Sequence, residues 1–286
     1  MEEKRARELE LLSYKIRRSA LEAIQYAGSG HVGGSFSIAE MLTVLYFEKM
    51  NIDPRDPRKK DRDRFVLSKG HCTPVGYATL AHRGFFPLDE LKTFRAIDSR
   101  LSGHMYIKVP GVDMSTGSLG QGLSAAVGMA LASKIDKIDY WVYAILGDGE
   151  IQEGQIWEAV MAAANLKLNN LVVFVDNNRL QLDGTVEEVM SVYPIDEKFR
   201  SFGWNVIAID GHNVREISDA VDKAKSSSDK PTVIVASTTK GKGVSIFENQ
   251  VKFHGKCPSK DEFEIAFREL DQKIASIEEK LNTATV

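Results

Sequence analysis

Two short polar motifs, each placed directly after an apolar run, constrain the fold of this chain more than any other feature. The first motif, GDGE at 147–150, follows the apolar run 141–146, and the second, DNN at 176–178, follows the run 171–175. The pattern of 155–168 between them is typical of a helix, so the whole segment predicts strand, turn, helix, strand and turn. Because parallel strands end at the same edge of a sheet, we expect both motifs at the ligand-binding edge of an open α/β sheet.

The residue types in these two motifs suit a diphosphate that is bound through a metal. Asp148 offers a carboxylate and Asn178 an amide oxygen, both hard donors of the kind that Mg2+ or Ca2+ prefers. Gly147 and Gly149 let the backbone approach an anion closely, and the helix N-terminus that follows favours negative charge. A lone Gly-Asp-Gly more often marks a simple turn, but here Asn178 follows Asp148 by about 30 positions with one helix and one strand between them. The pair therefore predicts a metal–diphosphate site.

The rest of the chain alternates between helical and strand patterns. Helices are predicted at 7–27, 37–50 (with Ser37 as the N-cap), 73–82, 119–135, 214–225 and 261–281, and further strands at 64–67, 204–209 and 232–237. Helices that alternate with short buried strands indicate an α/β fold, in which a parallel sheet is covered by helices on both faces. Without an internal repeat or a low-complexity linker, we expect a single domain over 1–286 that ends in the helix at about 261–281.

Composition argues against several classes of function. The 37 basic and 40 acidic residues leave a net charge of −3, which gives no electrostatic reason to bind nucleic acid or an anionic membrane surface. The sequence has no apolar stretch of about twenty residues, and its charged first residues precede no apolar signal core. Two cysteines, Cys72 and Cys257, make a disulfide framework unexpected. We therefore expect a soluble cytoplasmic protein.

Five further glycine-bearing segments accompany the two motifs. They are GSGHVGG at 28–34, LSKGH at 67–71, SGH at 102–104, TGSLGQG at 116–122 and TTKGKG at 238–243. In their order and approximate spacing, these segments and the GDG…NN pair resemble the transketolase family over roughly residues 10–260. The resemblance implies the fold of the family's diphosphate-binding (PP) domain, with thiamine diphosphate as the cofactor and Mg2+ or Ca2+ as the bridging metal.

Roles for individual residues follow from this resemblance alone. The implied metal ligands are Asp148, Asn178 and the backbone carbonyl of Leu180. The residues implied to bind the cofactor are His71, Gly117, Leu119, Gly147, Asp148, Gly149, Glu150, Asn178 and His254. The residues implied in catalysis are His31, His104 and His254, the first two at the hydroxyls of the donor sugar and in proton transfer. A lone loop histidine is more often structural, and we interpret His82 and His212, which match no family position, in that way.

The resemblance also implies an activity and a partner. The family's cofactor supplies carbanion chemistry. The implied reaction transfers a two-carbon ketol unit from a ketose phosphate such as xylulose 5-phosphate to an aldose phosphate, in the pentose phosphate pathway. Full-length transketolases continue into a pyrimidine-binding domain whose glutamate activates the aminopyrimidine ring. This chain stops after one diphosphate-binding domain, so we expect the N-terminal subunit of a split transketolase that is active only with a separate C-terminal subunit, as an α2β2 heterotetramer.

Three alternatives stay open on the sequence. The α subunit of a 2-oxo acid dehydrogenase also pairs a GDG…NN domain with a second chain, although SGHVGG and LSKGH favour a transketolase. A split transketolase for another sugar, such as apulose phosphate or a sulfo-sugar, has the same features in this half. A non-catalytic protein that binds metal and diphosphate is disfavoured by the four matching histidines, which mere binding does not require.

Overall fold

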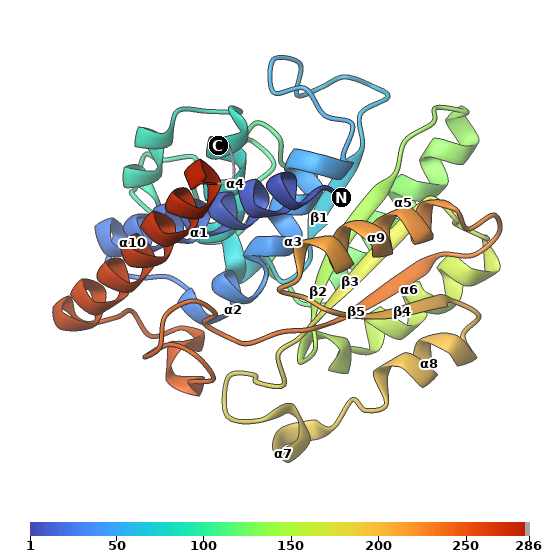
Figure 1. The fold of residues 1–286 in the computed structure, drawn as a ribbon. Coiled ribbons are helices and arrows are strands. Elements are labelled where there is room, and N and C mark those ends of the chain that lie inside the picture. Colours follow the sequence, from blue (N-terminus) through green and yellow to red (C-terminus); the bar gives the residue numbers. More distant parts are fainter. Residues whose placement is uncertain (284–286) are drawn as a thin grey trace.

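A parallel β-sheet forms the centre of the computed structural model, which describes residues 1–283 (Figure 1). Its five strands are β1 Arg64–Leu67, β2 Val142–Gly147, β3 Leu171–Asn177, β4 Asn205–Asp210 and β5 Thr232–Ser237. They lie in the order β1-β2-β3-β5-β4, and each neighbouring pair is parallel. Residues 171–176 of the central strand β3 are all buried, as expected for a strand covered on both faces. The predicted α/β fold class is confirmed.

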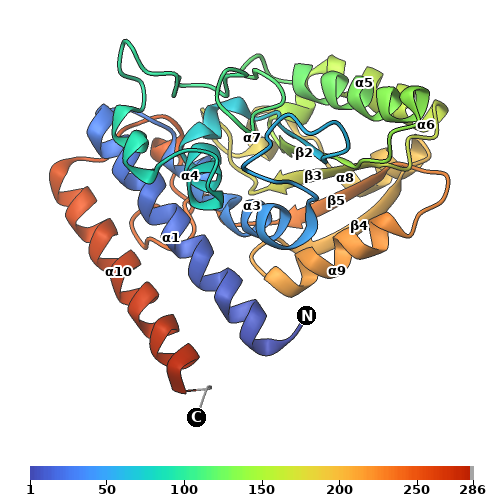
Figure 2. The same ribbon diagram turned by 90° about the horizontal axis from the view of Figure 1, so that it is seen from above.

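Helices cover both faces of this sheet (Figures 1 and 2). The helices are α1 Glu3–Ala27, α2 Val32–Ser37, α3 Ala39–Val44, α4 Thr73–Arg83, α5 Gln121–Asp136, α6 Gly154–Asn165, α7 Val186–Met190, α8 Ile195–Ser201, α9 Val214–Lys225 and α10 Lys260–Thr283. Short 3-10 or π turns lie at Leu45–Lys49, Gly70–Cys72, Leu88–Thr93, Glu150–Gln152 and Val251–His254. Tyr143 and Phe174 face the apolar cluster formed with α1 to α4 and α9, whereas Ala144 and Val173 face the cluster formed with α5, α6 and α8.

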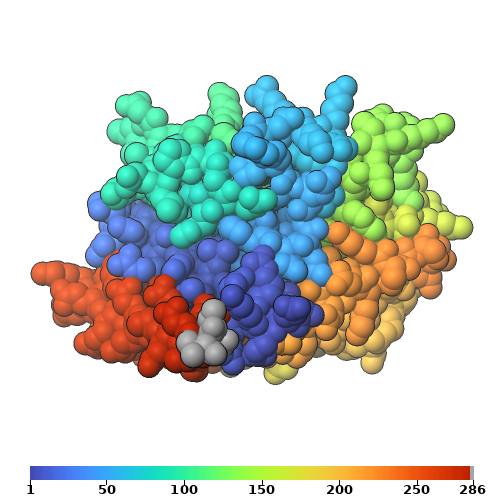
Figure 3. Space-filling view, turned by 45° about the horizontal axis from the view of Figure 1, so that its top comes forward, coloured from blue at the N-terminus to red at the C-terminus, as the bar shows by residue number. Residues whose placement is uncertain are grey.

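The terminal helix α10 packs along α1 instead of on the sheet (Figure 2). Phe263 and Leu270 are among its buried residues, and an ion pair between Arg18 Nε and Asp271 Oδ1 at 2.6 Å joins the two helices at the surface. In the space-filling view these two helices share one face of the molecule (Figure 3). None of the helices within residues 1–283 is long and apolar enough to cross a membrane.

The structure corrects the expected helix over 37–50. Ser37 is not an N-cap but the last residue of α2, and a non-helical residue, Ile38, separates α2 from α3. The Ser37 hydroxyl donates to the carbonyl of Gly34 at 3.0 Å and to the Asp176 carboxylate at 2.6 Å. A long-range hydrogen bond to the end of β3 therefore replaces the local capping bond that the sequence suggested. It also ties α2 to the carboxyl edge of the sheet.

A buried ion pair holds α1 against α3. Arg17 and Glu40 are 0% and 4% exposed, and Arg17 Nη1 lies 2.6 Å from Glu40 Oε1. Burial alone would raise the pKa of Glu40, but the Arg17 charge and the hydrogen bond with His212 outweigh it and lower this pKa to about 2. Glu40 is therefore an anion in the folded protein at neutral pH.

We expect Glu40→Gln to destabilise the protein at neutral pH, because breaking one side of a buried ion pair costs about 3–5 kcal/mol. The folded-state pKa of Glu40 lies below its ordinary value of 4.5. The stabilisation that this pair provides is therefore complete above pH 4.5 and is lost as the pH falls towards about 2. Urea unfolding at pH 7 and pH 3 should show that the difference in the free energy of unfolding between wild type and Glu40→Gln is smaller at pH 3. An equal difference at both pH values would show that the pair contributes no pH-dependent stability.

Candidate functional site

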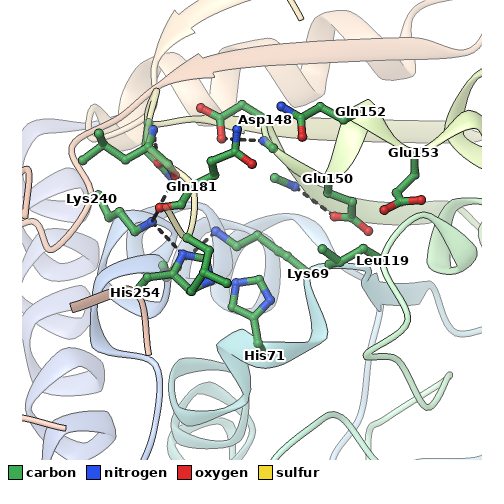
Figure 4. A pocket seen from close by; sticks show the side chains of 16 residues that line it. Lys69, His71, Leu119, Asp148, Glu150, Gln152, Glu153, Gln181, Lys240 and His254 are labelled. Atoms are coloured by element: carbon green, nitrogen blue, oxygen red, sulfur yellow. Dashed lines mark hydrogen bonds between the residues drawn. The ribbon is translucent and has the colours of Figure 1, made fainter. Parts of the chain in front are cut away.

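The loops that follow β1, β2, β3 and β5 meet at the carboxyl edge of the sheet, where they line a cavity of about 260 Å³ (Figure 4). The lining residues are Gly34, Lys69, His71, Leu119, Gly147, Asp148, Gly149, Glu150, Gln152, Glu153, Asn178, Leu180, Gln181, Leu182, Lys240 and His254. The register of β2 and β3 pairs Gly147 with Asp176, so the two polar motifs begin side by side. The cavity lining includes all the site residues expected from the sequence except His31, His104 and Gly117.

The Asp148 carboxylate is buried at the wall of this cavity. One oxygen accepts the N–H of Gly149 at 2.8 Å, and the other accepts the N–H of Arg179. Burial, followed by repulsion from the Asp176 carboxylate, raises the pKa of Asp148 to about 7, although the two N–H donors act in the opposite direction. A carboxylate that has lost its water in this way gains from a nearby divalent cation, which favours its charged form.

Two further oxygen atoms beside Asp148 suit a metal ion. The Asn178 side-chain amide donates from Nδ2 to Asp176 at 2.9 Å, and its Oδ1 accepts the N–H of Leu180 at 3.1 Å. The Leu180 carbonyl already faces a cation, because Lys240 Nζ donates to it at 3.0 Å. Carboxylate, amide and carbonyl oxygens are the donors that Mg2+ and Ca2+ select. Across residues 1–283, no three His, Cys, Asp or Glu side chains gather in a group that could hold a metal ion.

A buried ion pair between Lys69 and Asp176, which our sequence interpretation did not assign, supports the cavity from β1 and β3. The two side chains are 3% and 0% exposed, and Lys69 Nζ contacts Asp176 Oδ2. Burial alone would lower the pKa of Lys69, but the Asp176 charge raises it. Burial alone would raise the pKa of Asp176, but the Lys69 charge and several hydrogen bonds lower it. Both groups are therefore charged inside the protein.

Lys240 is a second buried cation, and its position was also not predicted. Its Nζ lies 2.8 Å from His254 Nδ1 as well as against the Leu180 carbonyl (Figure 4). Burial, followed by repulsion from Lys69, lowers the pKa of Lys240 to about 8. Gly241 has φ +79°, and a Cβ there would meet the Phe247 carbonyl oxygen at 2.3 Å, so only glycine permits the turn that follows Lys240. The Lys69 charge is paired with Asp176, so Lys240, whose Nζ contacts a carbonyl and an imidazole, is the cation that suits an anionic ligand.

Three of the four candidate histidines come together. The ring centroids of His31 and His71 and those of His71 and His254 are 5.1 Å apart, and those of His31 and His254 are 5.8 Å apart. Burial, together with neighbouring positive charges, lowers the pKa of His31 to about 4 and that of His254 to about 3. The pKa of His71 is lowered in the same way. At neutral pH each ring therefore offers one donor and one acceptor nitrogen.

His104 lies on an exposed loop, and its ring packs against Gly117. A Cβ at Gly117 would come within 2.9 Å of His104 Cδ2, so the glycine is needed for this contact. The His104 carbonyl accepts the hydroxyl of Tyr77 at 3.0 Å, which fixes the backbone of the loop. Burial, followed by repulsion from Arg95, lowers the pKa of His104. The structure thus places His104 beside the expected ring-supporting segment but outside the cavity lining.

Glu150 lines the cavity, but its carboxylate is engaged by protein donors. One oxygen accepts the Ser68 hydroxyl and the Gly120 N–H, the latter at 3.0 Å, and the other accepts the Gly147 N–H at 3.0 Å. Glu150 therefore joins the loop after β1, the start of α5 and the end of β2. Glu150 therefore stabilises the loops around the cavity. A direct contact between Glu150 and a cofactor stays a prediction from the resemblance.

The fold and this site define an open α/β protein with a polar cavity at the carboxyl edge of its sheet. The chain belongs to the transketolase family. Residues 10–275 match the family described as the thiamine diphosphate binding domain of transketolase. The predicted resemblance is therefore confirmed, and a 2-oxo acid dehydrogenase subunit is not supported.

Similar proteins include some that this chain covers almost fully and others of which it covers about half. An apulose-4-phosphate transketolase subunit of Phocaeicola vulgatus is 43% identical over 274 residues, which cover 96% of this chain and 98% of that protein. A 6-deoxy-6-sulfo-D-fructose transketolase subunit of Clostridium sp. is 47% identical over 259 residues, covering 90% and 94%. The solved transketolase of Campylobacter jejuni superposes with a TM-score of 0.83 at 31% identity, covering 96% of this chain and 48% of its own.

Proposed function

We propose that this chain is the diphosphate-binding subunit of a ketol transferase that uses thiamine diphosphate and a divalent metal. The observation that carries the proposal is the cavity where the oxygens of Asp148, Asn178 and Leu180 lie beside the buried cations Lys69 and Lys240. The three oxygens would hold Mg2+ or Ca2+, and Lys240 would neutralise the diphosphate. When bound, the cofactor supplies the carbanion chemistry that breaks and forms a carbon–carbon bond.

The histidines would provide hydrogen bonds and proton transfer around that chemistry. His71 and His254 line the cavity, and we propose that they contact the cofactor. His31 touches both of their rings, and its lowered pKa leaves an acceptor nitrogen at neutral pH. We propose that His31 and His104 bind the hydroxyls of the donor sugar and move protons to and from them. Gly117 and Leu119 would support the cofactor rings.

We propose that a separate chain carrying the pyrimidine-binding domain completes this site. Relatives that this chain covers almost fully are named as subunits of a transketolase, whereas this chain matches 48% of the solved Campylobacter jejuni chain. An α2β2 assembly and a cytoplasmic location stay predictions from the sequence.

The donor is proposed to be a ketose with an anionic terminal group. The two relatives named above are called transketolase subunits for apulose 4-phosphate and for 6-deoxy-6-sulfo-D-fructose, which carry a phosphate and a sulfonate. Xylulose 5-phosphate and the pentose phosphate pathway stay the prediction from the sequence. The test is to compare kcat/KM for these three donors with one aldose phosphate acceptor, using the chain together with its partner subunit. Absence of ketol transfer from all three would count against the proposed function.

We expect His31→Ala and His104→Ala to reduce donor turnover by about 10²–10⁴-fold, the usual contribution of a general acid or base, while cofactor affinity stays nearly unchanged. Cofactor affinity should stay nearly unchanged because both side chains lie outside the cavity lining that would hold the diphosphate. His82→Ala is the matched control, because His82 contacts Ser19 at 2.9 Å on the helices away from the cavity. Single-turnover rates with the donor and calorimetric titration of the cofactor separate the two effects. Full turnover in both variants would make these histidines structural.

A further inference from the structure

A chain of hydrogen bonds runs from the buried Arg17–Glu40 pair to the loop that carries Lys240, and His212 is its central member. His212 Nδ1 lies 3.1 Å from Glu40 Oε2, and His212 Nε2 accepts the backbone N–H of Thr239 at 2.8 Å. His212 follows β4, Glu40 belongs to α3 and Thr239 follows β5, so the ring joins three elements that are distant in sequence. Thr239 directly precedes Lys240.

The two hydrogen bonds of His212 select one tautomer of its ring. Glu40, held as an anion by Arg17, can only accept a hydrogen bond. The N–H of Thr239 can only donate one. The hydrogen of His212 must therefore be on Nδ1, and Nε2 must present its lone pair to Thr239. Glu40 and Arg17 thus orient the ring, and the ring in turn holds the amide of Thr239.

The backbone around His212 is itself fixed against the end of β5. Gly211 donates its N–H to the Ser237 carbonyl at 2.8 Å. A Cβ at Gly211 would come within 2.5 Å of Thr238 Cγ2, so only glycine allows the two loops to approach this closely. The position of the imidazole relative to Thr239 is therefore set by the fold.

The loop at 238–243 is held on both sides of Lys240. The Thr238 hydroxyl donates to Asp176, and the Gly241 N–H donates to the Gly33 carbonyl at 2.9 Å. Between these two attachments, the bond from Thr239 to His212 fixes the residue directly before Lys240. The Lys240 side chain then extends to the Leu180 carbonyl at the proposed metal site.

We propose that His212 is a positioning residue for cofactor binding, which holds the loop at 238–243 so that Lys240 points at the diphosphate. The inference rests on the proposed function of the cavity. His212 does not line the cavity itself, so it acts through Thr239 and Lys240 and not by contact with the ligand. It therefore has a role that the sequence, which suggested only a structural histidine, did not indicate.

Asparagine and glutamine at position 212 separate the two hydrogen bonds of the ring. The amide of His212→Asn takes the place of Nδ1, so it keeps a donor for Glu40 and loses the acceptor for Thr239. The amide of His212→Gln takes the place of Nε2, so it keeps the acceptor for Thr239 and loses the donor for Glu40. The proposal predicts near-wild-type ligand affinity for His212→Gln and about tenfold weaker affinity for His212→Asn, as expected for one unsatisfied buried N–H. If His212 served only as a hydrogen-bond partner of Glu40, His212→Gln would bind the ligand more weakly than His212→Asn.

The measurement is calorimetric titration of the full chain with inorganic pyrophosphate and with thiamine diphosphate, both with excess Mg2+. Pyrophosphate probes the diphosphate half of the site and requires no pyrimidine-binding partner. His82→Asn is the control, because it loses a histidine contact with Ser19 away from the cavity and should bind as wild type. Thermal unfolding of each variant without ligand identifies a titration temperature at which all of the variants are folded. If His212→Asn does not fold, His212→Gln decides alone, and affinity about tenfold below wild type overturns the proposal.

The outcomes distinguish this inference from the proposed function. A wild-type chain that binds neither pyrophosphate nor thiamine diphosphate overturns the proposed site, and the inference with it. Wild-type binding combined with equal affinities for His212→Asn and His212→Gln, or with the tighter binding in His212→Asn, overturns the inference alone. The inference is supported if His212→Asn binds the ligand more weakly than wild type and His212→Gln binds it as wild type does.

Discussion

Assayed by itself, this chain should give no sustained ketol transfer, and addition of a separate pyrimidine-binding subunit should raise the rate by about 10³-fold or more, the size of a lost general acid–base contribution. The resemblance to transketolases implies that a glutamate of that second domain activates the aminopyrimidine ring of the cofactor. Glu150 cannot replace it, because both of its carboxylate oxygens are engaged by Ser68, Gly120 and Gly147. Glu153 lies at the start of α6 beside the proposed diphosphate site, so it would lie at the diphosphate end of a bound cofactor and not at its aminopyrimidine ring.

The assay compares the purified chain, the purified partner and their mixture, each with thiamine diphosphate, Mg2+ and ribose 5-phosphate as the acceptor. Xylulose 5-phosphate, apulose 4-phosphate and 6-deoxy-6-sulfo-D-fructose serve as separate donors, so that an unsuitable sugar is not mistaken for an inactive chain. With xylulose 5-phosphate, the product of transfer is sedoheptulose 7-phosphate. Its sustained formation by this chain without any partner would refute the split-enzyme proposal.

The strands were predictable from the sequence because buried parallel strands are short apolar runs between polar turns. The runs at 64–67 and 232–237 coincide with β1 and β5, and the run at 204–209 is one residue early for β4. Helices α7 and α8 were not predicted, since 5 and 7 residues are too few to show a clear helical period. A capping box of Thr185 and Glu188 at the start of α7 was the available signal.

Part of the site could also be predicted, because adjacent parallel strands bring their carboxyl ends together. Asp148 and Asn178 follow β2 and β3, and the pairing of these strands makes them neighbours. The roles of Lys69, Lys240 and His212 could not be predicted in this way, since a charged loop residue is usually solvated. Their positions depend on contacts distant in sequence, such as Asp176 for Lys69 and Glu40 for His212, which are 107 and 172 positions away.

We expect Asp148→Ala to lower the affinity for thiamine diphosphate in the presence of Mg2+ by about 100-fold or more, since even residues behind a metal ligand contribute 10–100-fold. The Asp148 carboxylate is the anionic member of the proposed ligand set, and Asn178 and Leu180 contribute uncharged oxygens. Its loss would weaken the proposed metal link between the protein and the diphosphate. Asp89→Ala is the matched control, because Asp89 is 89% exposed and is not among the residues that line the cavity.

Calorimetric titration of thiamine diphosphate tests most directly whether this cavity binds a diphosphate through a metal. The chain is titrated with its partner subunit, with Mg2+ or with a chelator, and with thiamine as the ligand that lacks the diphosphate. We predict tight binding only for wild type and Asp89→Ala, only with Mg2+ and only for thiamine diphosphate. Equal affinity for thiamine and thiamine diphosphate, binding that a chelator leaves unchanged, or wild-type affinity in Asp148→Ala would contradict this account of the site.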